Sequence, residues 1–273
     1  MLIAASLLLT LVSGATASTQ AKTEVVQETQ IRGGLPDFHA KASAGEPVRV
    51  AYLGGSITAA EGWRPKTLRF LQEHYPQTKV EEIFAAVAGT GSPLGAMRFD
   101  RDVLAKQPDL LFVEFAVNDR ALPALRIEEA MEGIVRKLWR RYPRADICFV
   151  YTLSKNMVKD YAAGKLSSSA TAMENVARHY GIPSIAFGVE VSRQLDSGRW
   201  VFQAAKELGE TDEAGRTVFS HDGTHPLEAG HVLYAGAVRR AWPLLTNELK
   251  AKAHELPEPL HVDNWEKIGR AHV

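Results

Sequence analysis

The sequence contains a single cysteine, Cys148, among its 273 residues. One thiol excludes an intrachain disulfide and every metal site built from several cysteines. Cys148 lies within the apolar run from 146 to 153, where a small buried hydrophobic side chain is its expected role. The fold must therefore rest on a packed core, which a chain of this length with 45% hydrophobic residues can supply as one compact domain.

The sequence also lacks an excess of charge, because 32 Lys and Arg residues balance 32 Asp and Glu residues. No basic stripe of the kind that follows a phosphate backbone is present. We therefore expect no nucleic acid partner.

No apolar stretch is long enough to span a bilayer, including the one at the N-terminus. That stretch is followed by small residues, with Ala15 and Ala17 in the spacing of a signal-peptidase site, so residues 1–17 are predicted to be a signal peptide. A secreted or periplasmic protein without a stable membrane span follows from this prediction. The absence of Lys and Arg before the apolar stretch is atypical, and a buried N-terminal helix is the alternative. Residues 18–45 are interpreted as an N-terminal extension.

The C-terminal end has an unusual sequence. Residues 268–273 read IGRAHV, which is the translation of the start of a common sequencing adaptor, so they are interpreted as an artefact. A natural polar tail is the alternative. The Pro-rich residues 256–267 are predicted to leave the domain, so that 251–273 forms a linker or the truncated start of a C-terminal region.

Strand-length apolar runs alternate with segments of helical period between residues 46 and 250, a pattern typical of one α/β domain with a parallel sheet. Their near-continuous apolarity predicts strands that are covered on both faces, in a three-layer α/β/α arrangement with a five-stranded parallel sheet. The predicted strands are 48–54, 80–87, 110–117, 146–153 and 182–187. The predicted helices are 64–75, 94–106, 126–141, 168–180, 189–208 and 227–249.

Ligands of an open α/β sheet bind at the carboxyl ends of its strands. The first three predicted strands are followed there by Gly54-Gly55-Ser56, by Gly89-Thr90-Gly91-Ser92 and by Asn118-Asp119. Two glycines before Ser56 permit a sharp turn with unusual dihedral angles that exposes the hydroxyl group. Taken alone, each of these groups is also compatible with an ordinary turn or helix cap.

A serine nucleophile needs a base and a group that orients the base. Asp222 and His225 lie three residues apart in a loop before the last helix, and both can point to the same edge of the sheet. His221 and His231 lie nearby, so a His/Asp metal site is the alternative. This cluster has no recognised ligand spacing, and we therefore expect no metal.

Together these four groups of residues, in this order, resemble the SGNH hydrolases, also called GDSL-type esterases, over residues 48–247. The resemblance implies a flavodoxin-like fold without a cofactor. It also implies Ser56 as the nucleophile, His225 as the base and Asp222 as its partner, with an oxyanion hole from the Ser56 N–H, the Gly89 N–H and the Asn118 amide. Two departures leave these atoms in place: the family's Gly-Asp-Ser-Leu is Gly-Gly-Ser-Ile here, and its Gly-x-Asn-Asp begins with Ala116. Gly91 is the alternative to Gly89.

The resemblance implies an exported serine ester hydrolase, and acetyl groups on a polysaccharide are its expected substrate. Trp63 and Arg64 follow the nucleophile and are predicted to bind a sugar, although helix packing and a surface charge explain them equally well. A thioesterase or arylesterase of the same fold and a non-catalytic carbohydrate-binding protein are the alternatives.

Overall fold

The computed structural model describes residues 25–247 and 250–269, and the predicted signal peptide lies outside them. The five predicted parallel strands are present as β2 (Val48–Gly54), β3 (Val80–Ala86), β4 (Leu110–Glu114), β5 (Asp146–Tyr151) and β6 (Ser184–Ala186). They lie side by side in the order β3-β2-β4-β5-β6. This is the flavodoxin-like order, in which the chain reverses direction across the sheet between β2 and β4. The predicted fold class is confirmed.

The sheet has a sixth strand that the pattern did not predict. β1 (Thr29–Gln30) pairs antiparallel with β6, with Thr29 opposite Ile185. Two residues without apolar alternation carry no strand signal. After β1, α1 (Pro36–Ser43) contacts β2, β5 and α9 (Glu228–Thr246). The described part of the predicted N-terminal extension is therefore built into the domain.

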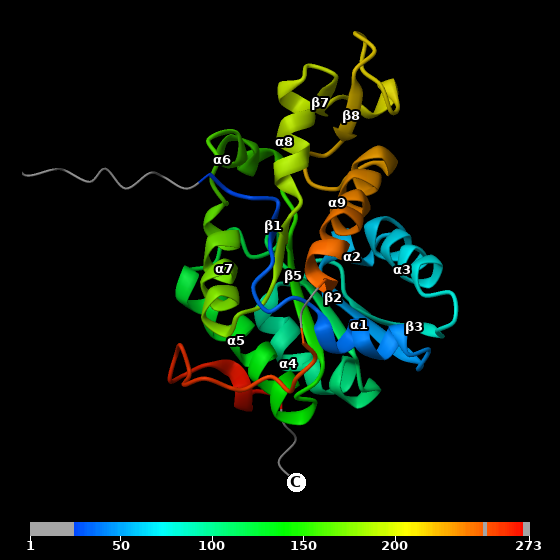
Figure 1. The fold of residues 1–273 in the computed structure, drawn as a ribbon. Helices are drawn as coiled ribbons and strands as arrows, with labels where there is room; N and C mark the ends of the chain where they lie inside the picture. The colour runs from blue at the N-terminus through cyan, green and yellow to red at the C-terminus, as the bar shows by residue number, and fades with distance from the viewer. Residues whose placement is uncertain (1–24, 248–249, 270–273) are drawn as a thin grey trace, which may run out of the picture.

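Helices cover both faces of the sheet (Figure 1). α3 (Trp63–His74) packs on α9, which also contacts α1 and α8 (Gly188–Asp196). On the other face, α5 (Ala124–Arg141) packs between α4 (Ser92–Asp102) and α7 (Ser168–Tyr180). The remaining helical elements of the described chain are two short helices, α2 (Ser56–Ala59) and α6 (Val158–Ala162), and the 3-10 turns η1 (Leu104–Lys106), η2 (Lys155–Met157), η3 (Lys206–Leu208) and η4 (Trp265–Lys267).

The predicted helix 189–208 is wrong in its second half. α8 ends at Asp196, and Gly198 adopts φ +72°, a left-handed conformation that stops the helix. The chain then forms β7 (Trp200–Gln203), which pairs with β8 (Thr217–Ser220) in a separate parallel pair. This pair lies beside α8 and above α9, near the top of Figure 1.

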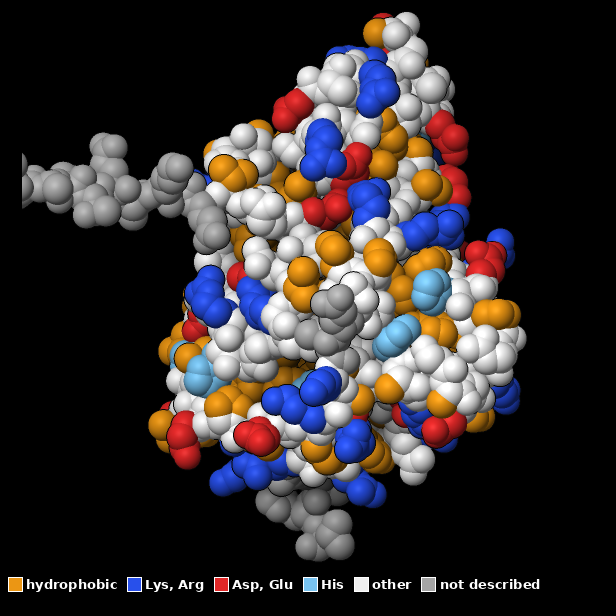
Figure 2. Space-filling model, viewed as in Figure 1, with side chains coloured by type: hydrophobic (Ala, Val, Ile, Leu, Met, Phe, Trp, Pro, Cys, Tyr) orange, Lys and Arg blue, Asp and Glu red, His pale blue; other side chains and the backbone are white. Residues whose placement is uncertain are grey.

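No helix among residues 25–247 and 250–269 is long and apolar enough to cross a membrane. On the face shown in Figure 2, basic and acidic side chains are interspersed, as the balanced charge of the sequence predicts.

The C-terminal segment does not leave the domain, contrary to the prediction for residues 251–273. Its described part, 251–269, folds back along α5 (Figure 1). The His254 ring stacks on Trp139 with centroids 4.4 Å apart, and its Nε2 lies 2.9 Å from Asp146 Oδ1. Arg136 Nε donates to Glu266 Oε2 at 3.1 Å. The buried polar residues of α5 therefore have partners in this segment.

Deleting residues 251–273 is expected to destabilise the fold. Arg136 is only 5% exposed, and removal of Glu266 would leave this buried charge without its carboxylate. Breaking a buried pair costs about 3–5 kcal/mol, so we expect the melting temperature to fall by roughly 10 °C. Differential scanning calorimetry measures this change. A chain that ends at Gly269 is the control, and an unchanged melting temperature in the longer deletion would contradict the assignment of 251–269 to the domain.

Candidate active site

Ser56 lies at the start of α2, immediately after the carboxyl end of β2. β2 is flanked by β3 and β4, so Ser56 stands beside the point at which the strand order reverses. Open α/β sheets bind their ligands at this point. The two glycines that precede Ser56 bring it there without a left-handed turn, because neither Gly54 nor Gly55 has a positive φ.

Gly54 and Gly55 are required for space, not for the unusual dihedral angles that the two glycines predict from the sequence. A Cβ atom on Gly54 would lie 2.5 Å from Thr58 Oγ1, and one on Gly55 would lie 2.2 Å from Asn118 Oδ1. Real Cβ atoms do not approach other atoms so closely. The absence of side chains at 54 and 55 therefore lets β4 and the Asn118 amide pack directly against the turn that carries Ser56.

The structure brings Ser56, His225 and Asp222 together. Ser56 Oγ lies 2.8 Å from His225 Nε2, and His225 Nδ1 lies 2.6 Å from Asp222 Oδ2. In this arrangement the histidine can accept the serine proton through one ring nitrogen while the carboxylate orients the other. The side chains of His225 and Asp222 are 50% and 55% exposed, so the site is open to solvent.

Asp222 is held by its own loop. Its Oδ1 accepts hydrogen bonds from the backbone N–H groups of Thr224 and His225, both at 2.8 Å, and from Ser220 Oγ at 3.0 Å. Partial burial alone would raise the pKa of Asp222, but these bonds and the one from the His225 side chain outweigh it and hold the pKa well below its usual value. The carboxylate is therefore charged over the whole working range of pH.

The loop of Asp222 is also hydrogen-bonded to the segment that follows β5. The N–H of Lys155, just after β5, donates to the Gly223 carbonyl at 2.8 Å. Leu227 N–H donates to Phe219 O at 2.7 Å and closes the loop onto β8. Both contacts fix the loop relative to the edge of the sheet at which Ser56 lies.

The predicted oxyanion residues lie on the loops that follow β3 and β4. Asn118 is packed over Gly55, directly before Ser56. Gly89 has φ +74° in an exposed loop, a conformation that favours glycine, and a Cβ there would meet nothing within 4 Å. Gly91 is needed for another reason, because its Cβ would lie 2.1 Å from Asp119 Oδ1.

Asp119 joins these two loops. Its carboxyl group accepts the N–H of Ser92 at the start of α4, with the two oxygens at 3.0 and 3.2 Å. Burial raises the pKa of Asp119 to about 6, and the bonds from Ser92 oppose this increase. Asp119 therefore positions the loop of Gly89 relative to its own neighbour, Asn118.

The prediction that Trp63 and Arg64 bind a sugar is wrong. Trp63 is fully buried and its ring packs edge-on against Tyr52, Phe112 and Phe187. Arg64 is only 4% exposed and pairs with Glu61 and Glu82, while its Nε donates to the Thr58 carbonyl at 3.0 Å. The alternative prediction, packing at the start of the helix, is confirmed for Trp63. The alternative for Arg64, a surface charge, is also wrong, because its charge is buried.

His221 and His231 are used elsewhere. His231 Nδ1 lies 3.2 Å from the N–H of Trp63, and burial lowers the pKa of His231 to about 4, so the neutral ring accepts this bond. His221 Nδ1 faces the Ala204 carbonyl at 3.3 Å. Among the described residues, one group has metal-ligand atoms within 4.8 Å of one another, namely Asp37, Asp146 and His254. Its carboxylates already accept bonds from Arg144, His254 and two backbone N–H groups.

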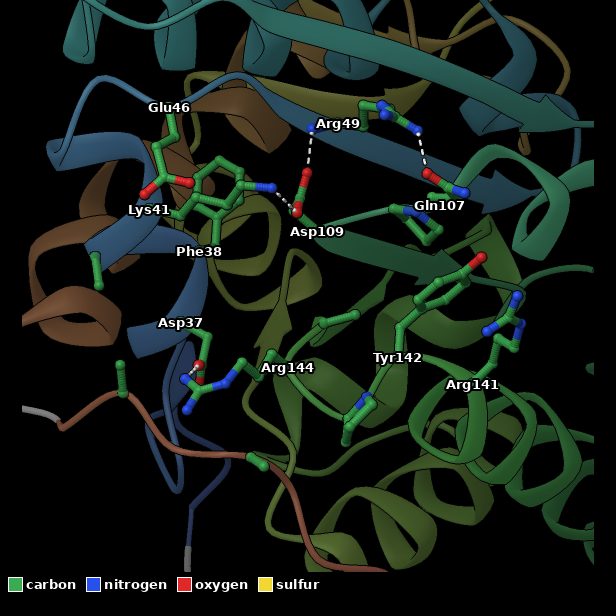
Figure 3. Close-up of a pocket in the computed structure, with 16 residues that line it drawn as sticks. Asp37, Phe38, Lys41, Glu46, Arg49, Gln107, Asp109, Arg141, Tyr142 and Arg144 are labelled. Atoms are coloured by element: carbon green, nitrogen blue, oxygen red, sulfur yellow. Dashed lines mark hydrogen bonds and ion pairs between the residues drawn. The ribbon is translucent and has the colours of Figure 1, made fainter.

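A sizeable pocket lies away from the triad (Figure 3). It is lined by residues at the amino ends of the strands, such as Arg49 and Asp109. Its charges are largely paired, with Lys41 Nζ 2.7 Å from Asp109 Oδ1 and Arg144 Nη1 2.7 Å from Asp37 Oδ1. Because Ser56 lies at the carboxyl ends, this pocket belongs to the opposite edge of the sheet.

The buried groups that support the turn of Ser56 were not among the residues predicted from the sequence. Glu114, at the end of β4, is 0% exposed and accepts hydrogen bonds from Thr58 and Thr152. A charged residue inside the apolar run 110–117 was a signal that could have identified it, because a buried charge is costly unless it has partners.

Comparison with known proteins shows the family and the fold of this chain. A family model, the GDSL-like lipase/acylhydrolase family, matches residues 52–233. No curated protein matches the chain. Among solved structures, a two-domain esterase active on acetylated mannans, co-crystallised with mannopentaose, is 26% identical with a TM-score of 0.68, and the match covers 86% of this chain and 60% of that one.

An acetylxylan esterase from Geobacillus stearothermophilus shares the fold with 16% identity and a TM-score of 0.57 over 74% of this chain and 96% of its own. The chain spans about 60% of the length of the two-domain esterase. The family match covers most of the chain, including Ser56, Asn118, Asp222 and His225. The chain belongs to the GDSL-like lipase/acylhydrolase family.

Proposed function

We propose that this protein is an exported serine esterase that removes acetyl groups from a polysaccharide through an acyl-enzyme on Ser56. The observation that carries the proposal is the continuous chain of hydrogen bonds from Ser56 through His225 to Asp222. A binding protein would not need a hydroxyl, an imidazole and a carboxylate aligned in this way. Export rests on the predicted signal peptide at residues 1–17.

In the proposed reaction, Ser56 Oγ attacks the acetyl carbon while His225 Nε2 takes the hydroxyl proton. The N–H groups of Ser56 and Gly89 and the side-chain amide of Asn118 hold the negative oxygen that develops. The sugar hydroxyl leaves with the proton from His225. A water molecule then gives a proton to His225 and attacks the acyl-enzyme. The bond between the acetyl group and Ser56 Oγ breaks, acetate is released, and His225 returns the proton to Ser56 Oγ.

Two observations support a polysaccharide as the substrate. The half-exposed side chains of His225 and Asp222 place the reactive atoms at the surface, where an acetyl group on a long polymer can reach them. The two-domain esterase to which this chain is similar is active on acetylated mannans. We therefore propose acetylated mannan as the first substrate to test, and acetylated xylan, pectin and ulvan as the comparison set.

Acetate release from these four polymers, and hydrolysis of p-nitrophenyl esters from acetate to palmitate, test the proposal. We expect turnover to be fastest for acetate among the p-nitrophenyl esters and to fall steeply with acyl length, together with release of acetate from at least one polymer. Turnover of acyl-thioesters or aryl esters without release from any polymer would favour a thioesterase or arylesterase. Binding to a polymer without any hydrolysis would favour the non-catalytic alternative.

A further inference from the structure

Glu114 is a fully buried acidic residue that the proposed reaction does not use. It is the last residue of β4 and is 0% exposed. Among the described residues, no Lys, Arg or His forms a salt bridge with it. Burial raises the pKa of Glu114, and hydrogen bonds from Thr152 and Thr58 oppose this increase. A buried carboxyl group without a cation is costly, so its partners must offset that cost.

The partners of Glu114 lie on both sides of Ser56. Thr58 Oγ1 donates to Glu114 Oε2 at 2.9 Å, and the N–H of Gly55 also contacts the Glu114 carboxyl group. Gly55 directly precedes Ser56 in the chain, and Thr58 follows it by two residues. The other carboxyl oxygen accepts from Thr152 Oγ1 at 2.6 Å, which ties the group to the end of β5.

The turn of Ser56 needs such external support. α2 has only four residues, and a single helical turn is not stable by itself. The hydroxyl group of Thr58 bonds to Glu114, and its backbone carbonyl accepts a hydrogen bond from Arg64 Nε at 3.0 Å. The packing leaves no room for adjustment, because a Cβ on Gly54 would collide with the Thr58 side chain and would lie 2.9 Å from the Glu114 carbonyl oxygen.

We propose that Glu114 is a positioning residue, whose carboxyl group holds the turn of Gly55 to Thr58 so that Ser56 Oγ stays within hydrogen-bond distance of His225 Nε2. The inference rests on the proposed role of Ser56 as the nucleophile. It assigns no chemical step to Glu114, since the carboxyl group is bonded to the turn and to β5, not to the reacting atoms.

The test compares Glu114→Ala with Glu114→Gln in the whole chain. For Glu114→Ala we expect the rate of Ser56 labelling by a fluorophosphonate, and kcat for p-nitrophenyl acetate, to fall about 10²-fold, as for a small displacement of a reacting group. KM should change little because the Glu114 side chain is fully buried and cannot contact the substrate. Glu114→Gln should restore most of both rates, since its amide accepts from one threonine and donates to the other.

A matched control separates positioning from stability. Glu132 is also 0% exposed, but it bonds to Tyr180 and to the backbone of the C-terminal segment along α5. Glu132→Ala should lower the melting temperature without slowing labelling of the folded protein. If Glu114→Ala does not fold, Thr58→Val against Thr58→Ser tests the same contact, and only the valine variant should label slowly.

Ser56→Ala, measured in parallel, separates this inference from the proposed function. Full turnover by Ser56→Ala would overturn the nucleophile assignment and with it the premise of the inference. An inactive Ser56→Ala together with a wild-type labelling rate in Glu114→Ala, or in Thr58→Val where the alanine variant does not fold, would overturn the positioning role alone.

Discussion

Replacing Ser56 by alanine is expected to lower kcat for p-nitrophenyl acetate by about 10⁶-fold and to abolish covalent labelling by a fluorophosphonate. The hydroxyl oxygen 2.8 Å from His225 Nε2 is the atom on which the acyl group would be carried, and alanine removes it. No other group of the site can replace it. Stopped-flow or steady-state release of p-nitrophenol, together with mass spectrometry of the labelled protein, measures both effects.

The same substitution should leave the fold intact, because Ser56 Oγ is a partly exposed group whose hydrogen-bond partner is the His225 ring. A change of this kind is within about 0.5 kcal/mol in the free energy of unfolding. Ser154→Ala is the matched control, since the Ser154 hydroxyl also lies beyond the carboxyl end of a strand and has no hydrogen-bond partner. Normal turnover by Ser56→Ala would return Ser56 to the role of an ordinary turn residue.

Replacing His225 by alanine is expected to be nearly as severe as the loss of Ser56, since knocking out either member of such a pair costs about 10⁶-fold in kcat. Without the imidazole, the serine proton has no acceptor within hydrogen-bond distance. Asp222→Asn should cost less, about 10⁴-fold, because it removes the carboxylate that orients the imidazole but keeps the base. The measurement is kcat for p-nitrophenyl acetate.

His221→Ala is the control for His225. The two histidines lie in the same loop, but His221 Nδ1 faces the Ala204 carbonyl and not the nucleophile. We expect its activity to stay near that of the wild type. A loss in His221→Ala as large as that in His225→Ala would show that the loop tolerates no change, and the base assignment would then need another test.

Because the triad is exposed to solvent, we expect mutations of the residues that hydrogen-bond its loops to lower activity. A buried site is held in place by the packing around it, whereas the side chains of His225 and Asp222 are half exposed. Their geometry therefore depends on hydrogen bonds within the loops. Ser220 and two backbone N–H groups hold Asp222, and Asp119 and Glu114 hold the loops on the other side.

The central sheet and the three residues that meet at the candidate site could be predicted from the amino-acid sequence. Buried parallel strands are recognisable because each is a local run of apolar residues, and the five predicted runs are the five parallel strands. Residues at the carboxyl ends of such strands meet at one edge of the sheet. Ser56 and Asn118 could therefore be placed at this edge from the sequence, whereas the roles of Asp222 and His225 were implied by the resemblance to the SGNH hydrolases.

The sequence did not predict which polar residues are buried or what they bind, because both depend on the packing of distant segments. Arg64 and Trp63 stand beside the nucleophile in the sequence, yet both side chains point into the protein. Residues 251–269 have the composition of a linker, and they lie on α5 because its Arg136 and Glu132 meet partners there. Likewise, Gly54 and Gly55 are required because β4 and Asn118 approach them. Burial and pairing depend on which distant segment covers a surface, and a local pattern of residues carries no information about that segment.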